Sequence, residues 1–218
     1  MKRIVLNIKN KKNITYAACE AARVLHTGGV IVYPTDTAYG LGANVFNRAA
    51  VRRVFRIKGR LRIKPLPIAV AGVAMARRIA AISKSAERFL ARVWPGTVTV
   101  VLPRRRKLSP TVSSGNSVGV RQPNHAFTKA LFKHINFPIT ATSANIAGKT
   151  PVYDIKSFVQ QFAKQKFKPD LIIDTGRLPL RKPSTVIDVT KKKPVILRKG
   201  AVPAKKLFRL LKNTSKHS

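Results

Sequence analysis

Short runs of β-branched and aliphatic residues alternate along the chain with longer stretches in which apolar residues return every three or four positions. The first pattern is typical of buried strands and the second of amphipathic helices. Residues 13–26, for example, place Ala18, Ala21 and Leu25 on one helical face, and the two glycines that follow are a common stop signal. The chain is therefore predicted to alternate helices with strands.

These patterns assign secondary structure to most of the chain. We expect strands at residues 30–34, 66–71, 97–102, 117–121, 139–142, 171–174, 185–189 and 195–198, and helices at residues 13–26, 48–57, 75–82, 84–94, 125–135, 154–163 and 203–212. This mixture predicts an α/β fold, an open, twisted, mixed sheet with helices packed on it. A length of 218 residues with 44% hydrophobic content is enough for one such domain.

Membrane and export signals are missing from the sequence. No apolar stretch approaches the roughly 20 residues needed to cross a bilayer, and the N-terminal segment lacks the sustained apolar run of a secretory signal. Cys19 is the only cysteine, which excludes an intrachain disulfide and fits a reducing compartment; its helical context predicts a small core residue. We expect a cytoplasmic protein.

Positive charge dominates the composition, since 44 Lys and Arg stand against 7 Asp and Glu and give a formal net charge of +37. Basic runs at residues 9–12, 104–107 and 191–193 spread this charge along the chain. Such a chain attracts polyanions. Two interpretations stay open: tRNA or another RNA is a functional partner, or the basic surface is solvated and has only nonspecific affinity.

Residue types that hold metals or nucleotides in well-known motifs are sparse. The four histidines lack metal-ligand spacing, and the carboxylates form no paired-acid motif. Gly40-Leu41-Gly42 suggests a turn after a strand, but the third glycine of a dinucleotide-binding loop is missing and no P-loop occurs. If the protein uses ATP, we expect scattered cations and hydroxyls to bind it, Mg²⁺ to be carried by the ATP phosphates, and no metal or cofactor to be held tightly.

A polar turn follows the predicted strand at residues 139–142. Ser143 and Asn145 alternate with Ala144, so in an extended backbone both side chains reach the same side. Strand ends of this kind are the usual ligand site of an α/β sheet. The same residues also fit a simple structural turn.

Four basic residues are candidates for binding anions. Lys58, Arg60 and Lys64 follow a predicted helix and combine two ammonium groups with a guanidinium that can fork across phosphate oxygens, although a solvated basic face would look similar. Arg121 lies on a valine-rich strand, where an exposed charge is a poor explanation. A bound carboxylate is its natural partner.

The pairs Lys58-x-Arg60 and Ser143-x-Asn145 resemble the signature of the YrdC-like threonylcarbamoyl-AMP synthase family. Further family-like segments follow in order at residues 28–42, 64–66, 94–99, 118–125, 184–188 and 196–200. The ordered set identifies the chain as a member of this family over roughly residues 14–202. The resemblance implies a YrdC-like catalytic domain at residues 1–202 and a C-terminal helix with a polar tail at residues 203–218, the short, single-domain form of the family.

The resemblance also implies roles for individual residues. Those expected at ATP are Lys58, Arg60, Lys64, Ser117, Ser143, Asn145, Thr150 and Arg198, with Lys58 and Arg60 taking part in catalysis. Those expected at threonine are Thr35, Arg121, the backbone of Ala141, and Ser184. No residue is expected to bind a metal.

The implied activity is an ATP-dependent synthesis of threonylcarbamoyl-AMP from L-threonine and bicarbonate or CO₂, with release of pyrophosphate. The product would serve the threonylcarbamoyl modification of adenosine 37 in tRNA, completed by separate transferase proteins. The high charge supports a rival hypothesis, a non-catalytic RNA-binding protein on the same fold that acts in ribosome or tRNA maturation. Carbamoyl transfer as in hydrogenase maturation is disfavoured, because the accompanying acylphosphatase and zinc-finger-like regions are missing.

Overall fold

The computed structural model describes residues 1–59, 65–105, 108, 112–113, 115–191 and 193–215. Two residues expected at the nucleotide, Arg60 and Lys64, lie outside these ranges. Within them, none of the helices combines the length and apolar character needed to span a membrane.

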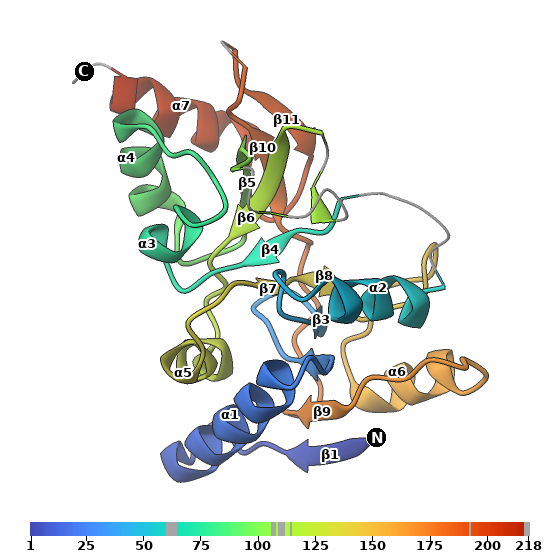
Figure 1. Ribbon diagram of the computed structural model, residues 1–218. Helices are drawn as coiled ribbons and strands as arrows, with labels where there is room; N and C mark the ends of the chain where they lie inside the picture. The colour runs from blue at the N-terminus through green and yellow to red at the C-terminus, as the bar shows by residue number, and fades with distance from the viewer. Residues whose placement is uncertain (60–64, 106–107, 109–111, 114, 192, 216–218) are drawn as a thin grey trace.

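Two mixed sheets organise the described residues (Figure 1). The five-stranded sheet has the order β1 (Lys2–Val5), β9 (Leu171–Asp174), β2 (Ile31–Tyr33), β3 (Gly40–Gly42), β8 (Thr142–Ser143). The six-stranded sheet has the order β11 (Val195–Arg198), β10 (Thr185–Asp188), β5 (Val98–Pro103), β6 (Ser117–Arg121), β4 (Ile68–Ala69), β7 (Ile139–Thr140). Both contain parallel and antiparallel pairs, so the predicted mixed α/β class is confirmed.

One short segment connects the two sheets. Residues 139–142 were expected to form a single strand, but β7 pairs with β4 in one sheet and β8 pairs with β3 in the other. Ala141 lies at the crossing, and its N–H donates to the carbonyl of Pro67 at 2.7 Å. The chain therefore passes from sheet to sheet at the polar turn singled out in the sequence.

Helices cover the sheets in groups (Figure 1): α3 (Val73–Ala76), α4 (Lys84–Val93) and α7 (Ala204–Ser215) beside the six-stranded sheet, and α1 (Lys11–His26), α5 (Ala126–His134) and α6 (Ile155–Phe162) beside the five-stranded sheet. Alternate residues of β2 serve two hydrophobic clusters. Ile31 and Tyr33 pack in the cluster that contains the buried faces of α1 and α5, whereas Val32 packs in the larger cluster with Phe158 of α6. This alternation follows from the two-residue period of a strand.

Helix α2 (Arg48–Ile57) positions Lys58 at its C-terminal end. Asn47 caps its start, because the Asn47 side chain accepts a hydrogen bond from the N–H of Ala50 at 3.0 Å. Val51 and Val54 lie on its buried face. Lys58 is the C-cap residue, so its position is set by the packing of the whole helix.

Three further sequence-based predictions are wrong. A helix was expected at residues 75–82, but the helix in this region is Val73–Ala76. The chain then leaves the helix in a turn, Ala80 forms a β-bridge with Arg104, and Ile79, Ala80 and Ile82 are buried. Cys19 is exposed on α1, beside His134, and is not a core residue.

The third wrong prediction concerns the Gly40-Leu41-Gly42 turn, which is strand β3. A Cβ on Gly42 would lie 2.9 Å from Cε1 of Tyr33, whose ring is fully buried across the strand and cannot move away. The glycines therefore allow the close approach of an aromatic ring.

Candidate functional site

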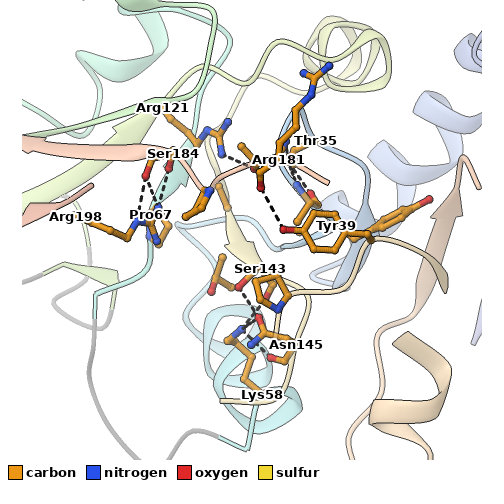
Figure 2. A pocket seen from close by; sticks show the side chains of 18 of the residues that line it. Thr35, Tyr39, Lys58, Pro67, Arg121, Ser143, Asn145, Arg181, Ser184 and Arg198 are labelled. Atoms are coloured by element: carbon orange, nitrogen blue, oxygen red, sulfur yellow. Dashed lines mark hydrogen bonds between the residues drawn. The ribbon is translucent and has the colours of Figure 1, made fainter. Parts of the chain in front are cut away.

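A cavity of about 700 Å³ lies where the two sheets meet, and residues far apart in the sequence line it. Its walls come from the loop between β2 and β3, the C-cap of α2, the end of β6, the β7–β8 segment and the adjoining ends of β10 and β11 (Figure 2). The sequence-predicted residues that line it are Thr35, Lys58, Arg121, Ala141, Ser143, Asn145, Ser184 and Arg198. Ser117 and Thr150 do not line it.

Lys58, Ser143 and Asn145 form one polar cluster (Figure 2). Lys58 is 3% exposed, and its ammonium donates to the backbone carbonyls of Ser143 at 2.5 Å and Asn145 at 2.9 Å. Ser143 Oγ donates to Asn145 Oδ1, and Asn145 Nδ2 donates to the carbonyl of Lys149 at 2.6 Å. A buried ammonium thus fixes the turn whose side chains face the cavity.

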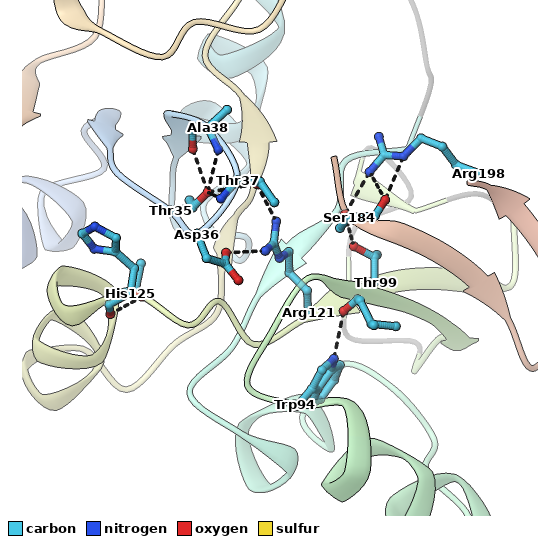
Figure 3. Close-up of polar contacts among 12 residues, drawn as sticks. Thr35, Asp36, Thr37, Ala38, Trp94, Thr99, Arg121, His125, Ser184 and Arg198 are labelled. Atoms are coloured by element: carbon cyan, nitrogen blue, oxygen red, sulfur yellow. Dashed lines mark hydrogen bonds and ion pairs between the residues drawn. The ribbon is translucent and has the colours of Figure 1, made fainter. Parts of the chain in front are cut away.

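Arg121 has a partner that the sequence interpretation missed. Its Nη2 pairs with Asp36 Oδ1 at 2.5 Å, and its Nη1 donates to Thr37 Oγ1 at 3.3 Å (Figure 3). Both charged side chains are buried. Among the described residues, Asp36 Oδ2 and Arg121 Nε have no hydrogen-bond partner. Arg121 therefore needs no ligand to neutralise its charge, although it lines the cavity.

Thr35 shapes the loop that brings Asp36 to Arg121. Its Oγ1 donates to the carbonyl of Ala38 at 2.7 Å and accepts from the N–H of Thr37 at 3.2 Å (Figure 3). These are the bonds of a side-chain-stabilised turn. The Thr35 hydroxyl thus holds the loop, and Thr35 also lines the cavity.

Ser184 and Arg198 form another wall of the cavity, apart from the Lys58–Ser143–Asn145 cluster. Arg198 donates to the carbonyl of Ser184 through Nε at 3.1 Å and Nη2 at 2.8 Å, and through Nη2 to Ser184 Oγ at 2.9 Å. Burial lowers the pKa of Arg198, and the positive charge of Arg121 lowers it further. Arg198 was expected at the nucleotide, but the contacts described here join it to a residue expected at threonine.

The comparison with known proteins agrees with this arrangement. The Sua5/YciO/YrdC family model, described as "Telomere recombination", matches residues 23–200. The chain belongs to this family. A threonylcarbamoyl-AMP synthase of Pyrococcus abyssi is 36% identical over 193 residues, which cover 88% of this chain and 56% of the relative. A putative threonylcarbamoyl-AMP synthase of Methanocaldococcus jannaschii is 32% identical over 182 residues, 84% of each chain.

The fold of the family is also evident from a solved structure. The crystal structure of P. abyssi Sua5 complexed with L-threonine matches with a TM-score of 0.84 and 33% identity, covering 96% of this chain and 60% of that one. The chain thus spans little more than half of these two longer P. abyssi chains. The YrdC-like assignment made from the sequence is confirmed.

Three further lining residues of this Sua5/YciO/YrdC chain have aromatic or charged side chains and were missed: Tyr39, Tyr153 and Arg181. The hydroxyl of Tyr39 accepts from the N–H of Thr175 at 2.9 Å and donates to the carbonyl of Gly176 at 2.7 Å, and burial raises its pKa to about 12. Tyr153 donates to the carbonyl of Arg181 at 3.2 Å. Both tyrosines anchor the segment that leads to Ser184. Only Tyr39 lay within a family-like segment.

Proposed function

We propose that this chain synthesises threonylcarbamoyl-AMP from L-threonine, bicarbonate or CO₂, and ATP, releasing pyrophosphate. The observation that carries the proposal is a single cavity with a Lys58–Ser143–Asn145 cluster on one wall and Arg121, Ser184 and Arg198 on another. The family membership and the names of the relatives support it.

The wall formed by Arg121 and Ser184 suits a small amino acid. Arg121 is a buried cation that lines the cavity, and a guanidinium matches the oxygens of a carboxylate. Thr35 and the backbone of Ala141 lie in the same cavity and are assigned to the remaining polar groups of threonine. The threonine bound by P. abyssi Sua5 supports this assignment.

The wall formed by the Lys58–Ser143–Asn145 cluster is assigned to ATP. Lys58, Ser143 and Asn145 present an ammonium, a hydroxyl and an amide, which suit phosphate oxygens. Arg60 and Lys64 would add two cations, and Ser117 and Thr150 would contribute from outside the cavity lining. Arg198 was expected at ATP but is bonded to Ser184 on the threonine wall, so we assign it to both substrates.

The reaction needs positioning and charge stabilisation more than covalent catalysis. Threonine and bicarbonate or CO₂ give a carbamate, whose oxygen attacks the α-phosphorus of ATP while pyrophosphate leaves. Holding three reactants together lowers the entropic part of the barrier, and fixed cations stabilise the charge that develops on the phosphates. Lys58 and Arg60 are the residues proposed to do this.

Magnesium is proposed to arrive with ATP. All seven acidic side chains lie in described segments, and each is engaged by the protein: Glu20 with Lys2, Asp36 with Arg121, Glu87 with Arg77, Asp154 with the N–H of Ser157, Asp170 with Arg53, Asp174 with Arg3, and Asp188 with Thr190. Described His, Cys, Asp and Glu side chains form no group of three suited to a metal. Phosphate oxygens would therefore hold the ion, as Mg²⁺ prefers.

Substrate choice tests the proposal. At saturating ATP and bicarbonate, threonine should release pyrophosphate well, serine less well for want of its methyl group, and valine very poorly because it leaves buried polar groups unpaired. Arg121→Ala should raise the KM for threonine far more than the KM for ATP, since the lost contact is to the carboxylate. Pyrophosphate release with each amino acid measures both effects. Equal turnover of valine and threonine would contradict the pocket, and no threonine-dependent release at all would favour the non-catalytic RNA-binding hypothesis.

RNA is proposed as a second partner, bound through the basic surface, with transferase proteins acting downstream. Because 44 Lys and Arg stand against only 7 Asp and Glu, most of the positive charge has no compensating carboxylate. Counterion release then predicts little sequence preference and an affinity that falls by about 10³–10⁵ between roughly 50 and 200 mM salt for 6–10 phosphate contacts.

Filter binding of tRNA and of an unrelated RNA across a salt series measures this dependence. Changing the exposed Lys9, Lys11 and Lys12 together to glutamine should reduce the salt slope by about one unit for each lysine that contacts phosphate. Tight, sequence-selective binding that survives high salt would contradict a purely electrostatic interface.

A further inference from the structure

Behind the Ser184 wall lies a buried hydroxyl that has no assigned role. Thr99 is on strand β5, next to β10, which Ser184 directly precedes. Its Oγ1 lies 2.9 Å from Ser184 Oγ (Figure 3). Thr99 is 3% exposed and does not line the cavity, whereas Ser184 does. Any effect of Thr99 on a ligand must therefore act through Ser184.

The direction of these hydrogen bonds follows from the groups involved. A guanidinium can only donate, so the bond from Arg198 Nη2 occupies one lone pair of Ser184 Oγ. Among the described residues, Ser184 is the only hydrogen-bond partner of the Thr99 hydroxyl. A buried hydroxyl that does not donate is costly. Thr99 therefore donates to Ser184 and occupies its second lone pair.

With both lone pairs of Ser184 Oγ occupied, its own hydrogen has neither Thr99 nor Arg198 as an acceptor. Ser184 lines the cavity, so this hydrogen is available to a ligand there. Arg121, which can only donate, lines the same cavity. The wall then presents donors alone, and a group that only accepts fits it.

We propose that Thr99 is a positioning residue that fixes the Ser184 hydroxyl as a donor and thereby makes this subsite selective for a carboxylate over a neutral amide. The inference rests on the proposed function, because it takes the carboxylate to be that of the amino acid substrate. An ionised carboxylate offers only acceptors, whereas a primary amide brings two N–H donors that would face Ser184 and Arg121. Without the Thr99 hydroxyl, Ser184 can turn and accept from an amide.

Direct binding of L-threonine and L-threoninamide tests the proposal without requiring turnover. Calorimetric titration at a pH where both ligands have protonated amines compares wild type with Thr99→Val and Thr99→Ser. Valine keeps the β-branched shape but removes the hydroxyl, and serine keeps the hydroxyl. In Thr99→Val we expect the affinity for threonine to fall about tenfold, because one oriented hydrogen bond to the carboxylate is lost. The affinity for threoninamide should change little. Thr99→Ser should keep the preference of wild type.

A matched control separates the orientation of the Ser184 hydroxyl from the general effect of losing a buried hydroxyl. Thr128 is also buried, and its hydroxyl donates to the carbonyl of His125 at 2.9 Å, outside the cavity. Thr128→Val should leave the threonine-to-threoninamide ratio unchanged. If Thr99→Val does not fold, Thr99→Ala removes the same hydroxyl and gives the same comparison.

The possible outcomes are distinct. An unchanged ratio in Thr99→Val, or equal weakening of both ligands, overturns the role of Thr99 while leaving the proposed function intact. Failure of wild type to bind threonine overturns the amino acid subsite and the inference together. A reduced ratio in Thr99→Val that Thr99→Ser restores supports the inference.

Discussion

Lys58→Ala is expected to lower threonine-dependent pyrophosphate release by a factor on the order of 10²–10³, the cost of removing one preorganised charge-stabilising group. The ammonium is buried and lies in the cavity wall beside Ser143 and Asn145. Its loss would remove a cation from the proposed phosphate site and also release the carbonyls that it holds. The two effects act on the same wall, so kcat should fall together with kcat/KM for ATP.

Steady-state rates at saturating threonine and bicarbonate measure this loss, and a thermal melt shows how much of the variant is folded. Lys156→Ala is the matched control, because Lys156 is exposed on α6 and lies outside the cavity lining. Arg60→Ala, which falls outside the described residues, is predicted from the sequence to have a similar effect. Wild-type rates in both Lys58→Ala and Arg60→Ala would exclude the proposed phosphate site.

Asp36→Ala is expected to lower the free energy of unfolding by about 3–5 kcal/mol, the usual cost of leaving one member of a buried ion pair unpaired. Asp36 and Arg121 are both almost fully buried, so water cannot replace the lost carboxylate. The same change should impair threonine binding, because Arg121 loses the contact that orients it. Urea denaturation measures the stability loss, and calorimetry measures the binding loss.

Two comparisons make this prediction specific. Glu87→Ala breaks the ion pair with Arg77, whose side chains are 46% and 39% exposed, and should cost at most about 1 kcal/mol. The double variant Asp36→Ala with Arg121→Met should be more stable than Asp36→Ala alone, because no buried charge is left uncompensated. If Asp36→Ala and Glu87→Ala destabilise equally, the Asp36–Arg121 pair does not behave as a buried charge pair.

Local pattern was enough to predict several elements. The predicted strands at 117–121, 171–174 and 195–198 and the helix at 48–57 match the structure residue for residue. In β6 and α2 the apolar spacing coincides with the buried face, and the apolar residues of β9 are all buried. Such spacing needs no knowledge of the partner element.

Local pattern failed where a partner creates the element. β1 has a single buried residue, Ile4, and exists because it pairs in parallel with β9 about 170 residues later. β3 has two glycines and little strand propensity, but it is held between β2 and β8. The apolar residues at 75–82 have the spacing of a helix, but in the structure several of them are buried after the chain has left the helix.

The sequence by itself determined the α/β class, the extreme basic charge, and the residue types that can bind phosphates and a carboxylate. These properties follow from composition, from the spacing of apolar residues and from the order of motifs, all of which can be read along the chain. Only the tertiary structure decided that Lys58 holds the Ser143–Asn145 turn, that Asp36 neutralises Arg121, and that Arg198 and Thr99 converge on Ser184. Hydrogen bonds and ion pairs require contacts within about 3 Å. Packing between strands and helices that are far apart in the sequence sets those distances, and no local pattern records it.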